Sequence, residues 1–192
     1  MAEKKLNIGV IIASTRPVRN GTQIADWVEQ TTSKDTDANY TYLDLAEINL
    51  PFLAEPKIPA MGDYELETTK KWAAQVEAQD GFLIIIPEYN HSYPASLKNA
   101  FDTLYSEWAM KPVGYVGYGS VGGARSIEAF SNALLNAEAV PLTSSSTNIM
   151  LFNQLDENGN FSASEYNENS LEGTLGKLKH WAKVLKTARQ AN

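Results

Sequence analysis

The segment 14–23 contains residue types that bind phosphate. It reads Ser-Thr-Arg-Pro-Val-Arg-Asn-Gly-Thr-Gln and stands directly before a helical pattern. Hydroxyls, arginine forks and the free N–H groups of a helix start all donate hydrogen bonds to phosphate oxygens. The segment matches neither the Walker A spacing nor the GxGxxG dinucleotide turn. Capping alone also explains a Ser or Thr at a helix start, so we favour phosphate binding because the segment follows a predicted strand.

The segment 87–94 has aromatic surface suited to covering a flat ring. It reads Pro-Glu-Tyr-Asn-His-Ser-Tyr-Pro and follows the apolar run 81–86. Its backbone groups can also bind the polar edge of such a ring. The alternative is a turn that only closes a helix onto the sheet. We leave His91 unassigned, since a lone histidine in a loop is more often a solvated polar group than a general acid.

The segment 119–123 is rich in glycine and is followed closely by Arg125. Glycine lacks a Cβ and lets the backbone approach a ligand closely. A tight turn explains these glycines equally well when the segment is taken alone. Beside the other two segments, it is predicted to form the third wall of a pocket for a planar, phosphorylated ligand.

The predicted strands place all three segments at one edge of a parallel sheet. The apolar runs 6–13, 81–86 and 112–118 are typical of strands buried on both faces. Residues 40–45 add one more strand, and residues 140–143, or the longer stretch 140–150, add another. Helical periodicity marks residues 24–31, 63–79, 94–108, 124–137 and 171–185. This alternation predicts an α/β, doubly wound fold, whose ligands lie beyond the carboxyl ends of the strands.

Two longer connections interrupt this alternation. Residues 51–59 contain Pro51, Pro56 and Pro59, and the connection is long enough to be functional. Residues 153–169 are polar and loop-like, with a strong turn signal at 156–160. Neither connection divides the chain, so we expect a single domain over residues 1–192.

The composition excludes several classes of protein. The chain has 192 residues, a net charge of -7, no cysteine and two isolated histidines. The negative charge argues against binding to nucleic acid, and the lack of cysteine and of histidine pairs excludes a thiol nucleophile and a zinc site. No apolar run is long enough for a membrane span, and residues 1–5 show no secretion signal, which indicates a cytoplasmic protein. Any redox chemistry must come from a bound cofactor.

Together, the three segments resemble the NAD(P)H-dependent FMN reductases of flavodoxin-like fold, a family that includes chromate, quinone and azo-dye reductases. Ser14-x-Arg16 is similar to the GSxR phosphate loop of this family, with Ala13 in place of the usual glycine. Residues 87–90 match its P-E-Y-N flavin loop, and residues 122–125 resemble its GG(A/S)R segment. The resemblance covers nearly the whole chain. It implies a five-stranded parallel sheet of order 2-1-3-4-5 with helices on both faces.

The resemblance also implies ligands and the residues that bind them. FMN is the expected cofactor and NADPH or NADH the co-substrate, with hydride passing to the flavin and on to a quinone, azo, flavin or metal-oxyanion acceptor. The residues expected to hold the phosphate are Ser14, Arg16, Asn20, Thr22 and Gln23. Those expected to line the ring are Pro87, Glu88, Tyr89 and Asn90, with Ser120 and Gly122 near it and Arg125 near the flavin or the nicotinamide nucleotide.

No catalytic acid or base is expected, because in such an enzyme the flavin carries the chemistry. The backbone N–H groups of residues 88–90 are expected to stabilise negative charge on the reduced ring, as donors do in an oxyanion hole. The family usually forms homodimers, and a homodimer or tetramer is expected here. Tyr105 and Trp108 are candidate contacts, with ordinary packing as the alternative for both.

Two other functions stay open. One is a flavodoxin-type electron carrier that binds FMN without oxidising NAD(P)H, although the segment 14–23 lacks the Ser/Thr-x-Thr-Gly-Asn-Thr pattern of flavodoxins. The other is a flavin-free binding module, since a fold does not fix a function.

Overall fold

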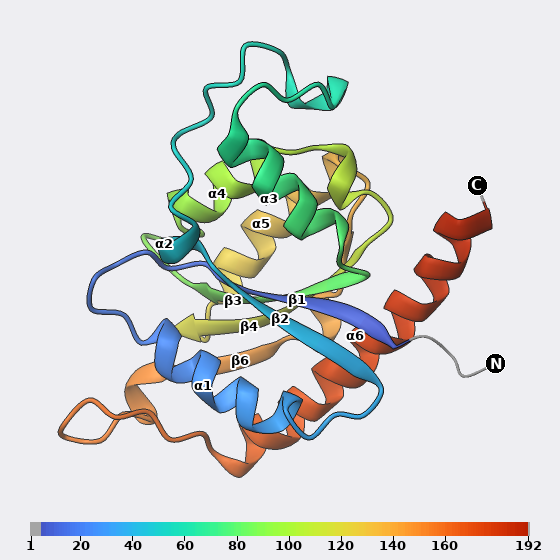
Figure 1. The fold of residues 1–192 in the computed structure, drawn as a ribbon. Helices are drawn as coiled ribbons and strands as arrows, with labels where there is room; N and C mark the ends of the chain where they lie inside the picture. The colour runs from blue at the N-terminus through green and yellow to red at the C-terminus, as the bar shows by residue number, and fades with distance from the viewer. Residues whose placement is uncertain (1–4, 192) are drawn as a thin grey trace.

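The computed structural model describes residues 5–191 and contains one parallel sheet (Figure 1). The strand order is β2-β1-β3-β4-β5, which confirms the predicted order, and β6 pairs with β4. The strands are β1 (Leu6–Ile12), β2 (Ala38–Asp44), β3 (Gly81–Pro87), β4 (Pro112–Gly119), β5 (Val140–Pro141) and β6 (Thr147–Met150). Residues 1–4 and residue 192 lie outside the described residues, so the prediction made for residues 1–5 falls almost entirely outside them.

Helices cover both faces of the sheet, as predicted. On one face lie α1 (Gly21–Thr32) and α6 (Glu165–Ala191), and on the other lie α3 (Glu67–Glu77), α4 (Ala95–Asp102) and α5 (Ala124–Asn136) (Figure 1). The shorter helices are α2 (Leu45–Ile48), η1 (Pro59–Met61), η2 (Ser106–Trp108), η3 (Thr143–Ser145) and η4 (Leu151–Asn153). None of the helices within residues 5–191 has the length and apolar character needed to cross a membrane.

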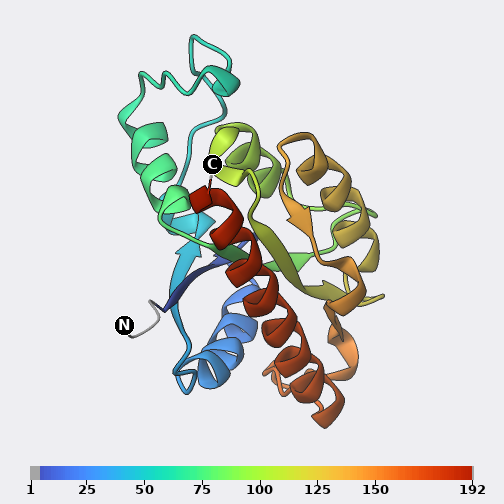
Figure 2. The same cartoon turned by 90° about the vertical axis from the view of Figure 1, so that its right-hand side faces the viewer.

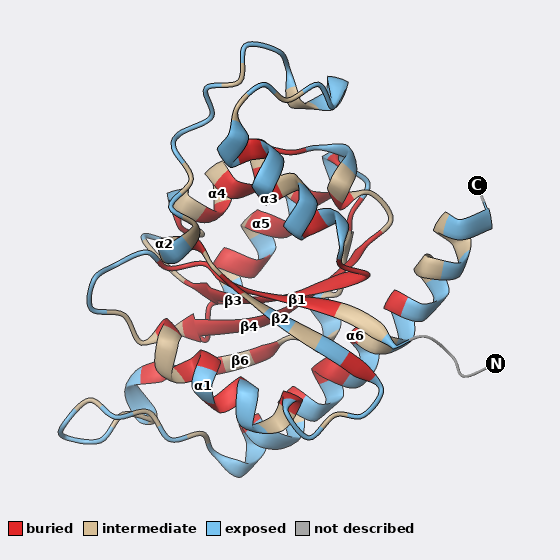
Figure 3. Cartoon of the chain, viewed as in Figure 1, coloured by how far each residue is buried: buried red, intermediate tan, exposed pale blue. Residues whose placement is uncertain are grey.

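The central strands β1, β3 and β4 are largely buried between these two layers, whereas the edge strand β2 is partly exposed (Figure 3). Every residue of β3 is buried, which explains its unbroken apolar sequence. Trp108 also belongs to the core: it is 3% exposed, and its indole N–H donates to the carbonyl oxygen of Phe101 at 3.2 Å. Of the two alternatives left open for Trp108, a dimer contact and ordinary packing, the structure therefore supports ordinary packing. Tyr105, by contrast, is 36% exposed.

The predicted fifth strand is two short strands. β5 pairs with the start of β4, and β6 pairs with its end, opposite Val116 to Gly119. Pro141 has no N–H group for a sheet ladder, and η3 then separates the two strands. As a result, β6 carries Asn148 to the carboxyl end of β4, beside the segment 119–125.

The last helix is longer than the sequence predicts. α6 begins at Glu165, inside the stretch 153–169 that reads as a loop. Ser164 caps this start, because its Oγ accepts a hydrogen bond from the Asn167 N–H at 3.3 Å. The loop therefore ends at residue 164.

Residues 49–66 form an arm between α2 and α3 that extends away from the sheet (Figures 1 and 2). The Glu55 carboxylate accepts hydrogen bonds from the N–H groups of Glu65 (2.8 Å) and Leu66 (3.1 Å). These bonds hold the end of the arm in an extended form, so α3 starts at Glu67 rather than at residue 63. The arm exposes the apolar side chains of Phe52, Leu53, Ile58 and Met61.

Lys111 is a cation buried at the end of α3. Its Nζ donates to the carbonyl oxygens of Val76 (2.9 Å) and Glu77 (3.2 Å), and its side chain is 4% exposed. Burial lowers the pKa of Lys111 from 10.5 to about 8. Between these two pH values the unfolded chain binds more protons than the folded chain, so the free energy of unfolding rises with pH.

We expect the free energy of unfolding to increase by up to about 2 kcal/mol between about pH 8 and about pH 9.5. Lys111→Met should abolish this increase, since methionine does not titrate. Tyr115 has the opposite effect on the free energy of unfolding, because burial raises the pKa of its phenol. This effect begins only above pH 10.0, where the phenol of an unfolded chain loses its proton. Urea denaturation at both pH values measures the effect. An equal increase in both proteins would show that Lys111 is not the cause.

Candidate functional site

The carboxyl ends of β1, β3 and β4 lie side by side in the sheet. Two backbone hydrogen bonds continue their ladders beyond the strands. The Ala13 N–H donates to the Ile85 carbonyl (3.1 Å), and the Glu88 N–H donates to the Tyr118 carbonyl (3.0 Å). The segments 14–23, 87–94 and 119–125 therefore start at one edge of the sheet, as predicted.

Ser14 ties the first segment to the second. The residue is fully buried, and its hydroxyl lies 2.7 Å from the Tyr89 hydroxyl. The Arg16 N–H lies 3.5 Å from the same Ser14 oxygen. Ser96 of α4 also holds the end of β1, because its hydroxyl donates to the Ala13 carbonyl at 2.7 Å. The buried side chain of Ser14 thus stabilises the conformation of the segment 14–23.

Arg19 and Arg16 have different surroundings. Arg19 forms an ion pair with Asp44 at the end of β2 and donates to the Ser14 carbonyl at 2.9 Å. Arg16 is exposed, and within residues 5–191 its guanidinium has no hydrogen-bond or ion-pair partner. It borders a hollow of about 490 Å³ whose other lining residues are Thr15, Pro17, Val18, Arg19, Thr22 and Ala46. Arg16 is therefore available to bind an anion, whereas Arg19 holds the segment in shape.

The start of α1 lies beside this hollow. Asn20 precedes the helix without capping it through its side chain, and the first turn contains no acidic residue. Thr22 lines the hollow, and its hydroxyl donates to the Arg19 carbonyl at 3.2 Å. The unpaired N–H groups of a helix start carry partial positive charge. This end of α1 therefore adds to the positive potential around Arg16.

Tyr118 lies under the start of α1. Its hydroxyl is buried, and no residue of the described chain forms a hydrogen bond with it. Burial raises the pKa of Tyr118 above its ordinary value of 10.0, while the nearby Ser14, Arg19 and Arg16 act in the opposite direction. A Cβ on Gly21 would come within 2.9 Å of that hydroxyl. Glycine at this place lets α1 begin in close contact with the Tyr118 hydroxyl.

Gln23 holds a distant segment of the chain. Its Nε2 donates to the Gly159 carbonyl (3.1 Å), and its Oε1 accepts from the Phe161 N–H (2.8 Å). The ring of Phe161 also packs edge-on against Trp27, with 5.8 Å between ring centroids. Both polar atoms of the Gln23 side chain are thus engaged with the segment 153–164.

We expect Gln23→Ala to loosen the segment 153–164 and to change the affinity for FMN by less than about threefold. Two neutral hydrogen bonds of about 1 kcal/mol each are lost, and neither reaches the hollow beside Arg16. Limited proteolysis of this segment measures the loosening, and Gln30→Ala on the exposed side of α1 is the matched control. A loss of FMN affinity of about tenfold without faster proteolysis would instead support the predicted role of Gln23 as a phosphate ligand.

The segment 87–94 contains a two-residue turn. Tyr89 and Ser92 exchange backbone hydrogen bonds of 2.8 and 3.0 Å, and Asn90 (φ 49°) and His91 (φ 67°) lie between them. Positive φ at both central residues is typical of tight hairpin turns. The N–H groups of residues 88–90 are predicted to stabilise negative charge on the ring, but those of Glu88 and Tyr89 are already bonded to the carbonyls of Tyr118 and Ser92. Among the described residues, the Asn90 N–H has no partner.

Glu88, Arg125 and His91 form a chain of polar contacts. The Glu88 side chain is 6% exposed, and its Oε1 lies 2.7 Å from Arg125 Nη2. Its other oxygen lies 3.3 Å from the Arg125 backbone nitrogen, which donates to it. Arg125 Nη1 lies 2.7 Å from His91 Nε2, and Arg125 Nε is buried without a partner in the described part of the chain. The Glu88 carboxylate thus positions Arg125.

The segment 119–125 turns sharply around three glycines with positive φ, namely Gly119, Gly122 and Gly123. Asn148 of β6 holds the turn, since its Nδ2 donates to the Gly122 carbonyl at 2.8 Å. Ser126 ties the start of α5 to the second segment by donating to the carbonyl of the buried Pro87 at 2.8 Å. Ser120 is exposed at the tip of the turn.

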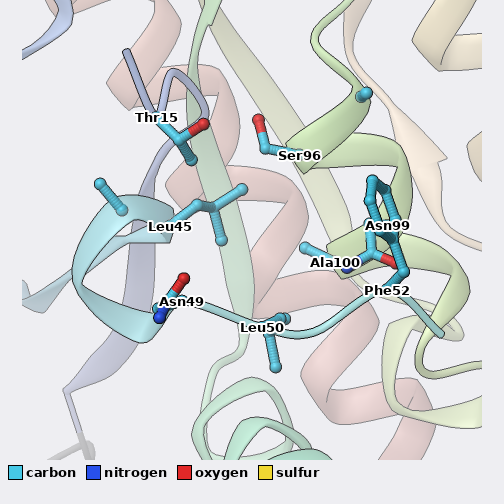
Figure 4. A pocket seen from close by; sticks show the side chains of 10 residues that line it. Thr15, Leu45, Asn49, Leu50, Phe52, Ser96, Asn99 and Ala100 are labelled. Atoms are coloured by element: carbon cyan, nitrogen blue, oxygen red, sulfur yellow. The ribbon is translucent and has the colours of Figure 1, made fainter. Parts of the chain in front are cut away.

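A second hollow, of about 420 Å³, lies on the other side of Thr15 (Figure 4). Its walls come from α2, the start of the arm and α4. The hydroxyls of Thr15 and Ser96 stand near one end of it, and Leu50 and Phe52 contribute apolar surface. Thr15 and Ala46 line both hollows, so the candidate site has open space toward α2 as well as beside Arg16.

Several residues that shape the site were not predicted from the sequence. They are Arg19, Asp44, His91, Ser96, Tyr118, Ser126 and Asn148. Only Arg19 and His91 lie within the three segments predicted to bind a ligand, where their residue types were visible. The others act through contacts between distant parts of the chain.

The chain matches the family model described as NADPH-dependent FMN reductase over residues 6–153. An NAD(P)H-dependent FMN reductase of Schizosaccharomyces pombe is 42% identical to it over 116 residues, which are 59% of this chain and 58% of that protein. The chain thus matches less than two thirds of the length of this relative. A 2-hydroxy-1,4-benzoquinone reductase of Burkholderia sp is 27% identical over 195 aligned positions. This match covers 93% of this chain and 97% of that reductase.

Among solved structures, a similar fold is found in FerB of Paracoccus denitrificans, described as a flavoenzyme NAD(P)H:(acceptor) oxidoreductase. The TM-score is 0.72 at 21% sequence identity, and the match covers 93% of this chain and 97% of FerB. This similarity concerns the fold.

Proposed function

Because the chain belongs to the NADPH-dependent FMN reductase family, we propose that it binds FMN and passes hydride from NADPH or NADH to a small-molecule acceptor. The proposed acceptors are quinones, azo compounds, free flavins and metal oxyanions, and the name of the Burkholderia relative supports a quinone. One observation carries the proposal: three segments with ligand-binding residue types meet at the carboxyl ends of β1, β3 and β4.

The first segment fits the phosphate of FMN. Arg16 offers an exposed guanidinium without a partner in the described chain, and Thr22 and the start of α1 border the same hollow. A guanidinium and helix N–H groups form charge-assisted hydrogen bonds with a phosphate. Ser14 contributes indirectly, because its hydrogen bond with Tyr89 holds the segment 14–23 in place. Asn20 stands just before the helix start and completes the proposed set.

The second and third segments fit the ring of FMN. Asn90 offers an N–H group that has no partner in residues 5–191, and Ser120 and Gly122 belong to the turn 119–123. A Cβ on Gly119 would come within 3.3 Å of the Glu88 Cβ, so glycine lets the two segments approach closely. Beyond the ring, Arg125 Nε is buried without a partner among the described residues, and a polar group of the co-substrate can accept a hydrogen bond from it.

Bound FMN would supply the hydride chemistry at this site. The chain supplies position and electrostatics. Arg16 and α1 bind the phosphate end, while Asn90 donates a hydrogen bond toward the ring and favours negative charge there. Arg125 lies at the edge of the site, where a guanidinium favours an anionic co-substrate.

We also propose that the protein works as a homodimer in the cytoplasm, where reduced nicotinamide nucleotides are available. The exposed Phe52, Ile58 and Met61 of the arm support a contact between copies, since such side chains gain from removal from water. Tyr105 is a further candidate for this contact. Light scattering at micromolar concentration tests the dimer, and a monomer under these conditions would rule it out.

Steady-state oxidation of NADPH with 1,4-benzoquinone as the acceptor tests the proposed function. We expect turnover that requires added FMN and saturates with NADPH. A protein that binds FMN but leaves NADPH unoxidised would overturn the proposal in favour of an electron carrier. A protein that does not bind FMN would favour a flavin-free binding module.

A further inference from the structure

The sequence assigns no role to His91, but the structure gives it a specific contact in the site. It lies at the second position of the turn between Tyr89 and Ser92, with φ 67°. Glycine is the residue best suited to this left-handed conformation, and histidine adopts it at a cost. Residues other than glycine that are held in this conformation cluster at functional sites.

The contact that His91 makes is with Arg125. Its Nε2 lies 2.7 Å from Arg125 Nη1. A guanidinium only donates hydrogen bonds, so His91 Nε2 must accept and the proton of the neutral ring must sit on Nδ1. The geometry therefore selects one tautomer of His91.

Arg125 is held from two sides by this arrangement. The Glu88 carboxylate binds Nη2 from the buried side, and His91 binds Nη1 from the exposed side. The Arg125 side chain is still 37% exposed, which leaves guanidinium N–H groups free to bind a ligand. Without His91, the described contacts leave Glu88 as the only side chain that orients this guanidinium.

We propose that His91 is a positioning residue: its neutral imidazole holds Arg125 in the orientation in which the guanidinium binds the phosphates of the nicotinamide co-substrate. This inference rests on the proposed function. A dinucleotide carries a diphosphate, and a guanidinium binds two phosphate oxygens best when its plane is fixed in advance. His91 fixes that plane and does not itself touch the reacting atoms.

Three variants test this role. In His91→Gly, the turn keeps a residue suited to its conformation, but Arg125 loses its second partner. We expect the KM for NADPH to rise about tenfold, with kcat and the dissociation constant of FMN unchanged within about twofold. His91→Gln retains an acceptor oxygen and should restore most of the affinity for NADPH. If His91 acts through Arg125, then Arg125→Ala and the double variant should have the same KM.

An NMR measurement on the FMN-free protein tests the contact itself. Long-range ¹H–¹⁵N spectra of the imidazoles distinguish a proton on Nδ1 from one on Nε2, and His180 is the only other histidine in the chain. We expect the Nδ1-H tautomer for His91, lost in Arg125→Ala. A proton on Nε2, or an unchanged KM in His91→Gly, would overturn the inference. If NADPH is not oxidised at all, the proposed function fails, while the tautomer still decides whether His91 binds Arg125.

Discussion

Replacing Gly123 with alanine is expected to destabilise the protein by about 3 kcal/mol or more. Gly123 has φ 72°, a conformation that costs an alanine about 1–2 kcal/mol. A Cβ there would also lie 2.7 Å from the Tyr118 backbone nitrogen and 2.8 Å from Gly117 Cα. Backbone atoms of a central strand cannot move aside cheaply, so α5 or β4 must shift. The shift displaces the turn 119–123, and binding of FMN should weaken with it.

Gly159 provides a matched control for this substitution. Its φ of 79° is similar, but an added Cβ would meet nothing within 4 Å. Gly159→Ala should therefore lower the free energy of unfolding only by the cost of the left-handed conformation, about 1–2 kcal/mol. Denaturant unfolding of the two variants and the parent protein gives both losses. Equal losses would show that the contact between the turn and β4 is looser than described.

Arg16→Ala is expected to weaken binding of FMN by about 10- to 100-fold. The variant removes the guanidinium that lies without a partner beside the hollow at the start of α1. Riboflavin has the same ring and no phosphate, so its affinity should change by less than about twofold. Fluorescence titration of the FMN-free protein with each ligand measures both affinities.

Two further variants sharpen the result for Arg16. Arg16→Lys keeps the charge without the planar fork and should give an intermediate affinity. Lys71→Ala removes a cation from the exposed side of α3, far from the segment in sequence, and should change nothing. Equal loss of FMN and riboflavin affinity in Arg16→Ala would show that Arg16 shapes the site rather than binding the phosphate.

The sequence contains enough information to predict the sheet and the edge at which the three polar segments meet. The apolar runs of β1, β3 and β4 are strong signals, because strands buried on both faces tolerate few polar residues. Once their parallel order is inferred, the segments that follow them must meet at one edge. Ser164 was a visible signal for the start of α6, and Pro141 for the end of β5.

The roles of individual side chains were harder to predict, because they depend on contacts between distant residues. Arg16 and Arg19 are alike in the sequence, yet Asp44 of β2 binds only Arg19. Gln23 reads as part of a phosphate loop, yet its amide is engaged with Gly159 and Phe161. No local pattern distinguishes such pairs, since their partners come together only when the sheet and its connections are complete.

Anaerobic reduction of the FMN-loaded protein by NADPH is the most direct test of the central claim. After incubation with FMN and removal of the excess, we expect the yellow absorption of one FMN per chain. One equivalent of NADPH or NADH should bleach it, and Arg16→Ala should retain less flavin after the same treatment. A protein that stays colourless after incubation with FMN, or one whose bound FMN keeps its colour in excess NADPH and NADH, would contradict the account.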